Sequence, residues 1–191
     1  LLKKMGFPLK DLIIATNENN ILHRIIKNND FTLFDVVKTN SPSMDITISS
    51  NFERILSEFL DTSSLVDLYQ KIPNKDHKKN LDEEVHKNLS DLFTSMSASS
   101  DEVITQIEKT YNNFNLIIDP HTAVGLVCAE KLGIKGAMCL ACAHPVKFQD
   151  TVKMSINKEL KFEKDFNFDH EEKFDFLKND YSIMKEYIQN H

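Results

Sequence analysis

A short apolar run, Asp11 to Thr16, follows a Gly-Phe-Pro breaker and is typical of a buried β-strand. After the polar loop 17–20, apolar residues recur at helical spacing, and they predict a helix that ends in the polar residues 27–30. These helix positions are Ile21, Leu22, Ile25 and Ile26. A strand, a loop and a helix in this order form half of a parallel crossover.

The middle of the chain predicts helices joined by polar segments. Residues 41–45 read as a loop, and a helix with apolar positions at 52, 55, 56 and 59 is expected after a serine or asparagine cap at 49–51. The stretch 73–100 is polar and of mixed charge, which predicts one or two helices around 81–96 in a peripheral subdomain. A further helix is expected after a cap at 100–102.

The last third repeats the strand and helix alternation. We expect a short strand at Leu116–Ile118, a loop at 119–122 in which Asp119 and Thr122 serve the start of a helix, and that helix from Ala123 to Leu132. The last predicted segments are a second buried strand at Ala137–Ala143, a helix from His144-Pro145 through Val152, and a closing helix around 181–188.

Alternating strands and helices predict an α/β fold with a mostly parallel sheet. In such sheets ligands bind at the carboxyl ends of the strands, which selects the loops 17–20, 119–122 and 142–145. Asn17, Glu18 and Asn19 are therefore expected to line a cleft. His121 and His144 stand in two of these loops, where an imidazole either acts on a substrate or caps a helix, and the sequence leaves both roles open.

Composition narrows the class of protein. The 191 residues carry a net charge of -6, which argues against binding to a nucleic-acid backbone or an anionic membrane. No apolar run approaches the roughly 20 residues that span a bilayer. The odd number of cysteines in apolar surroundings favours reduced thiols and a cytoplasmic location. Since the chain begins at Leu1 without an initiator methionine, we expect it to be part of a longer protein.

Four segments resemble motifs of one enzyme family. LIIATNENN (12–20) resembles "IATNEND", and SPSMDITISSNFER (41–54) resembles "SPSMDI…SSNFER". DPHTAVG (119–125) and AHPVKF (143–148) resemble "DPHTAVG" and "TAHPAKF". These are motifs of bacterial and fungal threonine synthases, and here they occur in the family's order.

The resemblance implies a pyridoxal 5'-phosphate (PLP) enzyme of fold type II, the tryptophan-synthase-β type. This fold is a three-layer, mostly parallel sheet flanked by helices, of which the chain is expected to form the C-terminal half. The implied reaction converts O-phospho-L-homoserine and water to L-threonine and phosphate by γ-elimination and β-addition of water. The expected parts are 1–60 and 101–156 in the large PLP domain, 61–100 as a peripheral helical subdomain, and 157–191 as a helical tail.

In that family the Schiff-base lysine and the glycine-rich phosphate loop lie N-terminal to the first motif found here. The chain alone is therefore expected to be inactive and to have the N-terminal half as its partner. Its glycines, Gly6, Gly125, Gly133 and Gly136, are too scattered to form a phosphate cup.

Cys142 occupies the position before Ala-His-Pro where the family has a threonine that faces the pyridine nitrogen of the cofactor. A neutral side chain there leaves the ring unprotonated and favours elimination over transamination. The alternative is a buried small hydrophobic residue at the end of a strand. Cys139, Cys142 and His144 also permit a zinc site, but strand alternation places the two cysteines on opposite faces, so no metal site is expected.

Ser43, Asn51 and Arg54 are the candidate ligands of the substrate phosphate. Hydroxyl, amide and guanidinium donors suit a doubly charged phosphate, and Arg54 is one of only two arginines. The alternative is an ordinary ion pair between Glu53 and Arg54. The whole chain likewise keeps an alternative, that of a non-catalytic threonine-synthase-like binding module.

Overall fold

The computed structural model describes residues 2–72, 80–158 and 171–190. The chain divides into two compact units, Leu1–Leu160 and Lys161–His191. The first unit contains a parallel sheet and seven of the described α-helices, and the second contains one described helix. None of the helices in these described ranges is long and apolar enough to cross a membrane.

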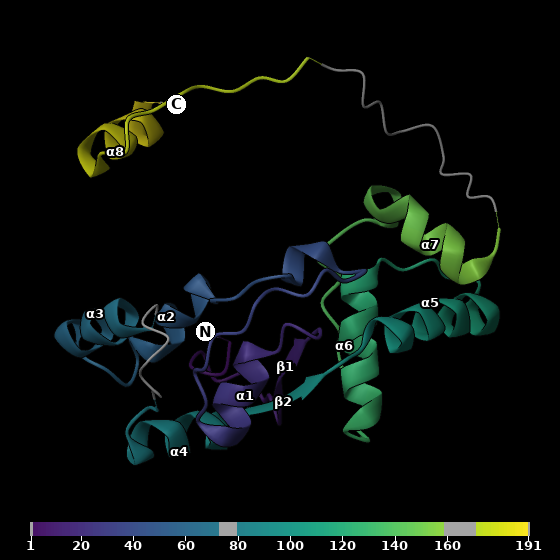
Figure 1. The fold of residues 1–191 in the computed structure, drawn as a ribbon, viewed down its shortest axis with the longest axis horizontal. Coiled ribbons are helices and arrows are strands. Elements are labelled where there is room, and N and C mark those ends of the chain that lie inside the picture. Colours follow the sequence, from purple (N-terminus) through teal and green to yellow (C-terminus); the bar gives the residue numbers. More distant parts are fainter. Residues whose placement is uncertain (1, 73–79, 159–170, 191) are drawn as a thin grey trace. The chain divides into compact units, whose positions relative to one another are not determined.

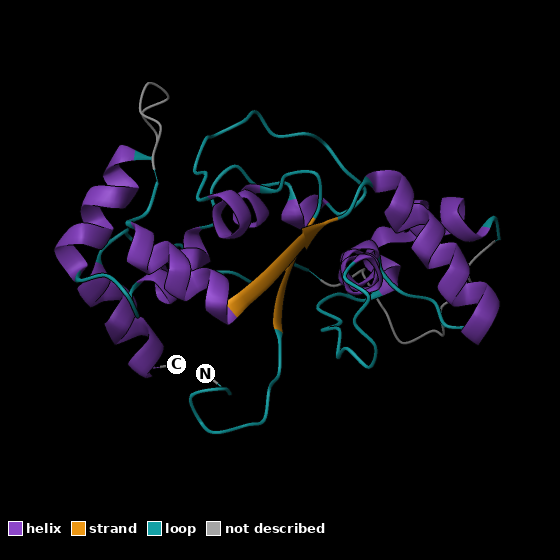
Figure 2. Ribbon diagram, turned by 90° about the horizontal axis from the view of Figure 1, so that it is seen from below, coloured by secondary structure: helices purple, strands orange, loops and turns teal. Residues whose placement is uncertain are grey.

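Two parallel strands lie at the centre of the first unit (Figure 2). Strand β1 (Leu12–Thr16) pairs with β2 (Phe93–Ser97) in a register that sets Leu12 beside Phe93 and Thr16 beside Ser97. The prediction of β1 is confirmed. Strand β2 falls in a stretch for which helices were expected, so that part of the prediction is wrong. Its stability comes from pairing with β1, a contact with a distant segment that local pattern does not reveal.

Helices surround this sheet, and three short 3₁₀ helices join them. The α-helices are α1 (Ile21–Asn28), α2 (Glu53–Leu56), α3 (Thr62–Lys71), α4 (Glu83–Leu92), α5 (Ser100–Phe114), α6 (Pro120–Lys131) and α7 (Gln149–Ile156). The 3₁₀ helices are η1 (Pro42–Met44), η2 (Ser50–Phe52) and η3 (Pro145–Phe148). The predictions of α1, α4, α5, α6 and α7 are confirmed. The helix expected after Ser49 forms as η2 and α2, and it ends at Leu56.

The apolar core consists of two clusters, one on each side of the strands. Helices α1, α2 and α4 contribute to the first cluster, which includes Ile25, Leu56 and Leu89. Helices α5, α6 and α7 form most of the second cluster. Ile14 of β1 packs against the first cluster and Ala15 against the second, because successive strand side chains point to opposite faces. Figure 1 shows the strands between these two groups of helices.

Capping interactions fix the start of the two helices that border the sheet edge. Ser99 Oγ accepts from Glu102 N at 3.3 Å, and Glu102 Oε2 accepts from Ser99 N at 2.8 Å, so α5 begins with a complete capping box. Helix α6 begins with Asp119 as its cap and Pro120 in its first turn. The prediction that Asp119 serves the start of this helix is confirmed.

The segments Leu116–Ile118 and Ala137–Ala143 are not strands, contrary to the prediction. A strand requires a hydrogen-bonded neighbour, and within the described ranges the sheet consists of β1 and β2 alone. The second segment is also not buried: Met138 is 90% exposed and Leu140 is 76% exposed. Apolar sequence favoured a buried strand here, but apolar character does not supply the pairing partner.

The second unit contains α8 (Tyr181–Asn190), which confirms the predicted closing helix. Asp180 precedes it, and its Oδ1 accepts from Ser182 N at 2.9 Å, as an N-terminal cap does. The ring of Phe174 lies edge-on to Phe176 at 5.1 Å in the same unit.

Candidate functional site

The candidate site lies where β1 and β2 both end, at the carboxyl edge of the parallel pair. Thr16 O accepts from Ala98 N at 2.9 Å, and Asn17 O accepts from Ser97 Oγ at 3.3 Å, so the two exits are joined directly. Ligands of parallel sheets bind at this edge. The loop that follows β1 is therefore the first component of the site.

Asn17 fastens this loop to the segment 39–45. Its side chain is buried, with 2% of the residue exposed. Its Nδ2 lies 2.9 Å from Thr39 Oγ1, 3.0 Å from Ser41 Oγ and 2.8 Å from Asp45 Oδ1. Its Oδ1 accepts from Asn19 N at 2.9 Å. One amide group thus organises the turn after the strand and a loop more than twenty residues away.

Asp45 accepts the remaining hydrogen bonds of the same network. Its Oδ1 also accepts from Asn19 Nδ2 at 2.9 Å and from Thr39 Oγ1 at 2.7 Å. Its Oδ2 accepts from Thr39 N at 2.9 Å. Asn19 in turn bonds to both backbone groups of Val37 at 2.8 Å. We call the set Asn17, Asn19, Thr39, Ser41 and Asp45 the amide clamp.

Glu18 points the other way, toward α5. Its Oε1 accepts from Ser100 N at 2.7 Å, at the start of that helix. A carboxylate is favourable there because the first backbone N–H groups of a helix lack partners within it. The Asn17–Asn19 loop therefore holds two neighbouring segments, and its contacts in the structure are with those segments.

A second contact holds the same 39–45 segment from the side of α6. His121 Nε2 lies 3.2 Å from Ser43 N, across 78 residues of sequence. His121 Nδ1 lies 2.9 Å from Asp119 Oδ1. The ring of Phe148 in η3 lies 4.6 Å from the imidazole ring. Three of the motif segments, around Ser43, Asp119 and Phe148, thus meet at one histidine.

Asp119 is ionised in this setting. Burial by itself raises the pKa of its carboxyl group, but hydrogen bonds from His121 and Thr122 stabilise the charged form more and lower the pKa below its ordinary value. Oδ1 accepts from His121 N at 2.9 Å, and Oδ2 accepts from Thr122 Oγ1. This buried carboxylate both caps α6 and orients the imidazole.

The three candidate phosphate ligands are exposed and lie in three different helices. Ser43 lies in η1, Asn51 in η2 and Arg54 in α2. Within the described ranges, no hydrogen bond or ion pair connects Asn51 or Arg54 to Ser43. Of the three, only Ser43 is brought to the sheet edge by a contact of its own, through its backbone N–H.

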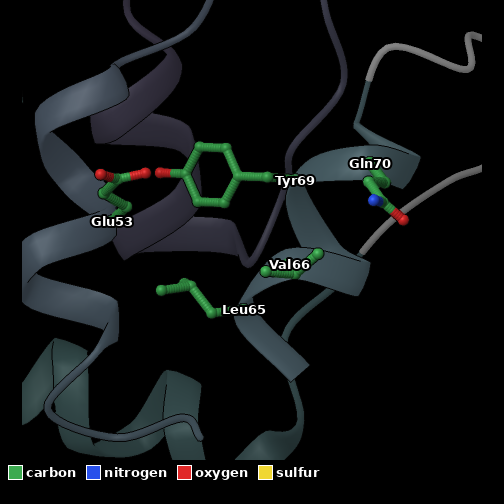
Figure 3. A pocket seen from close by; sticks show the side chains of 5 residues that line it. All are labelled: Glu53, Leu65, Val66, Tyr69 and Gln70. Carbon is green, nitrogen blue, oxygen red and sulfur yellow. The ribbon is translucent and has the colours of Figure 1, made fainter. Parts of the chain in front are cut away.

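The alternative ion pair between Glu53 and Arg54 is not among the ion pairs of the described residues. The carboxylate of Glu53 instead faces the hydroxyl of Tyr69 (Figure 3) in a pocket also lined by Leu65, Val66 and Gln70. Burial, and to a smaller extent the charge of Glu53, raise the pKa of Tyr69 to about 12. This pocket lies beside α3, and its lining includes none of the clamp residues.

Cys142 lies on the exposed segment 137–143, and its Sγ donates to Leu140 O at 3.6 Å. The alternative interpretation of this residue as a buried hydrophobic residue is therefore wrong for this chain. Cys139 is half-buried near Gly125 of α6. Within the described ranges, no group of three or more metal-ligating side chains is close enough to hold a metal ion.

The described residues fit one contact of a PLP cofactor and not the whole of its site. An exposed neutral thiol at Cys142 is able to donate to an aromatic nitrogen, although more weakly than a hydroxyl. The described glycines remain dispersed, and three of them, Gly6, Gly133 and Gly136, have positive φ in separate turns. Clustered backbone N–H groups of the kind that cradle a phosphate are not found among them.

Sequence reasoning did not foresee the amide clamp or the contact between His121 and Ser43. Asn17, Ser41 and Asp45 were visible as polar residues in motif-like segments, but nothing in their spacing shows that they meet. The one signal in the sequence is that Asn17 directly follows a strand expected to be buried. A buried amide requires partners for its donors and its acceptor, so such a position predicts contacts with other polar residues.

Comparisons with known proteins agree on one family. The family model described as "Threonine synthase, C-terminal" matches residues 122–188. Threonine synthase of Saccharomyces cerevisiae is 37% identical over 186 residues, which cover 85% of this chain and 36% of the yeast protein. Threonine synthase of Pseudomonas aeruginosa is 33% identical and is covered over 34% of its length. The chain thus spans about a third of the length of these relatives.

The fold is similar to solved structures from the same family. The structure of PLP-bound threonine synthase from Brucella melitensis superposes with a TM-score of 0.76 at 32% identity, over 98% of this chain and 42% of that one. The yeast threonine synthase structure gives a TM-score of 0.73 at 36% identity, over 87% of this chain and 37% of that one. The α/β architecture with a parallel sheet, expected from the sequence, is confirmed.

Proposed function

Since the chain belongs to the threonine synthase family and corresponds to its C-terminal portion, we propose that it supplies one side of a PLP-dependent active site. The reaction proposed for the complete enzyme is the conversion of O-phospho-L-homoserine and water to L-threonine and phosphate. PLP, when bound, supplies the electron-withdrawing ring that this elimination requires.

The amide clamp is the observation that carries the proposal. It fixes the segment 39–45 at the carboxyl edge of the parallel strands, where a ligand of such a sheet binds. A preorganised loop favours ligand binding, because ordering a flexible loop on binding costs free energy and weakens affinity. The buried Asn17 and the network at Asp45 hold this segment in place.

Cys142 is proposed to face the pyridine nitrogen of the cofactor as a neutral donor. A neutral partner leaves that nitrogen unprotonated, which favours elimination over transamination. Ser43, Asn51 and Arg54 are proposed to bind the substrate phosphate. Arg54 supplies a positive charge and the other two supply neutral donors, a combination that suits a phosphate group in an acidic protein.

The partner we propose is the remaining portion of a threonine synthase. Met138 and Leu140 expose most of their surface on a segment without a strand neighbour, and Leu116 is 55% exposed. Large exposed apolar side chains grouped on extended segments mark surfaces that another polypeptide covers. The three cysteines are free thiols, which supports a cytoplasmic location.

A hybrid enzyme tests the proposal. The aligned region of yeast threonine synthase is replaced by this chain, and phosphate release from O-phospho-L-homoserine is measured with added PLP. We expect release of phosphate with equimolar formation of threonine. The yeast portion alone and this chain alone are the controls, and both are expected to be inactive.

A folded hybrid that binds PLP but releases no phosphate would favour the second candidate, a non-catalytic module of the same fold. Folding is checked by circular dichroism, and PLP binding by its absorbance. Mixing the two portions as separate polypeptides provides a second assay if the fused hybrid is insoluble.

A further inference from the structure

His121 links the start of α6 to the segment 39–45. On one side its Nδ1 lies 2.9 Å from Asp119 Oδ1, and on the other its Nε2 lies 3.2 Å from the backbone N of Ser43. The side chain is only 9% exposed. This geometry places the imidazole between a fixed carboxylate and the loop that the amide clamp also holds.

The partners determine which ring nitrogen carries the proton. The backbone N–H of Ser43 is a donor and has no lone pair to offer, so Nε2 must accept and is unprotonated. Asp119 is ionised and accepts only, so Nδ1 must donate. The ring that satisfies both contacts is the neutral Nδ1–H form. A protonated ring would set an N–H group against the N–H of Ser43.

We propose that His121 is a positioning residue that holds the Ser43 loop through its neutral imidazole, and that protonation of the ring releases this loop. The role of the loop in phosphate binding rests on the proposed function above. The contact itself does not depend on it, because it is made entirely by this chain.

Three groups of the described residues contact the ring. Asp119 faces it from the start of its own helix, Phe148 faces it from η3 with an aromatic ring, and the loop presents the uncharged N–H of Ser43. The contact between Nε2 and the N–H of Ser43 exists only with the neutral ring.

Two substitutions separate the two contacts. In His121→Gln, the carbonyl oxygen lies as many bonds from Cβ as Nε2 does, so it is able to accept from Ser43 N–H, and it does not titrate. In His121→Asn, the amide nitrogen corresponds to Nδ1, so it keeps the bond to Asp119 but does not reach Ser43. Both variants retain the carboxylate that caps α6.

The measurement is amide hydrogen exchange and ¹⁵N chemical shift of Ser43 by NMR in the 191-residue chain. We expect exchange at Ser43 to be roughly 3- to 10-fold faster in His121→Asn, the effect of losing one hydrogen bond, and near the wild-type rate in His121→Gln. Exchange at Ala123, whose N–H bonds to Asp119 O within α6, is the internal reference and should not change.

The pH series gives the second readout. In the wild type, the Ser43 amide shift should follow the titration of the His121 ring, observed through its own carbon-bound protons. In His121→Gln it should be constant over the same range. An unchanged Ser43 exchange rate in His121→Asn, or a Ser43 shift that does not follow the ring, would overturn the proposal. An inactive hybrid enzyme with these NMR results intact would refute the proposed function only.

Discussion

The side-chain amide of Asn17 donates to the carboxylate of Asp45 at 2.8 Å, joining the exit of the first strand to the end of the 39–45 loop. Both residues belong to segments with the character of family motifs. The amide nitrogen lies within hydrogen-bond distance of three side chains, and it has two hydrogens to share among them. Substitutions of Asn17 therefore measure how much the amide clamp contributes to the free energy of unfolding.

Asn17→Ala should lower the free energy of unfolding by about 1–3 kcal/mol, because it leaves buried acceptors without their donor. Asn17→Asp should cost more, since it also sets a second carboxylate against Asp45. Urea unfolding of the 191-residue chain measures both. Asn113→Ala removes an exposed amide from α5 and should have little effect. Equal losses at positions 17 and 113 would contradict a special role of the clamp.

Asp119 should make stability depend on pH in the acid range. Its native pKa is lowered, so the unfolded chain binds the proton at a higher pH than the folded chain does. Its contribution is complete above the ordinary carboxyl pKa of about 3.9, and it is lost as the pH falls through the lower native value.

Asp119→Asn should therefore destabilise the chain by about 1.5–3 kcal/mol at neutral pH and by progressively less as the pH falls below about 3.9. Urea unfolding at a series of pH values measures the difference. Asp101→Asn removes an exposed acid from the first turn of α5 and is the matched control. A difference between wild type and Asp119→Asn that does not vary with pH would show that Asp119 acts through shape alone.

The two arginines should differ in how much they contribute to stability. Arg24 is partly buried, donates to Asp30 at 2.8 Å and lies 4.4 Å from the ring of Phe34, so Arg24→Ala should destabilise the chain by about 1.5–3 kcal/mol. Arg54 is exposed, and Arg54→Ala should leave stability within about 0.5 kcal/mol.

In the hybrid enzyme, Arg54→Ala should reduce kcat/KM for O-phospho-L-homoserine roughly 10- to 150-fold, the effect of losing a charge-assisted phosphate contact. Arg54→Lys tests whether charge alone is enough. An unchanged kcat/KM in Arg54→Ala would remove Arg54 from the proposed phosphate site.

Substitutions of Cys142 should test its role in activity without changing the stability of the fold. Because its side chain is exposed, Cys142→Ser and Cys142→Asp should each leave the unfolding of the 191-residue chain within about 0.5 kcal/mol. In the hybrid enzyme, Cys142→Ser replaces one neutral donor by a stronger one and should retain activity. Cys142→Asp should lose most of it, because a carboxylate favours a protonated partner. A normal rate of threonine formation in Cys142→Asp would end the proposed contact.

Local signals in the sequence were enough for most helices. Pro120 after Asp119 marks the start of α6, and the cap of α5, expected at 100–102, is Ser99, one residue earlier. Each of these signals acts over three or four residues, so it can be recognised in the sequence alone. The closing helix α8 was likewise predicted from its local sequence.

Strands were less predictable, because they depend on neighbours. Phe93–Ser97 has no strongly apolar pattern, yet it is a strand since β1 lies beside it. Ala137–Ala143 is apolar, yet it is not a strand in the described part of the chain. The same limit applies to the site: a motif identifies Ser43 and His121 as notable residues, but only the fold shows that one holds the other.

The pairing of β1 with β2 also affects how the chain folds. Thr16 donates its hydroxyl to Met96 O, a residue 80 positions later. Bringing such distant residues together costs loop entropy before any contact compensates for it, and proteins rich in such pairs fold slowly. Helices α1 and α5 form from local contacts, so they are available early, whereas the edge that carries the site is assembled late. During synthesis on the ribosome, that edge cannot exist until β2, about eighty residues after β1, has left the ribosome.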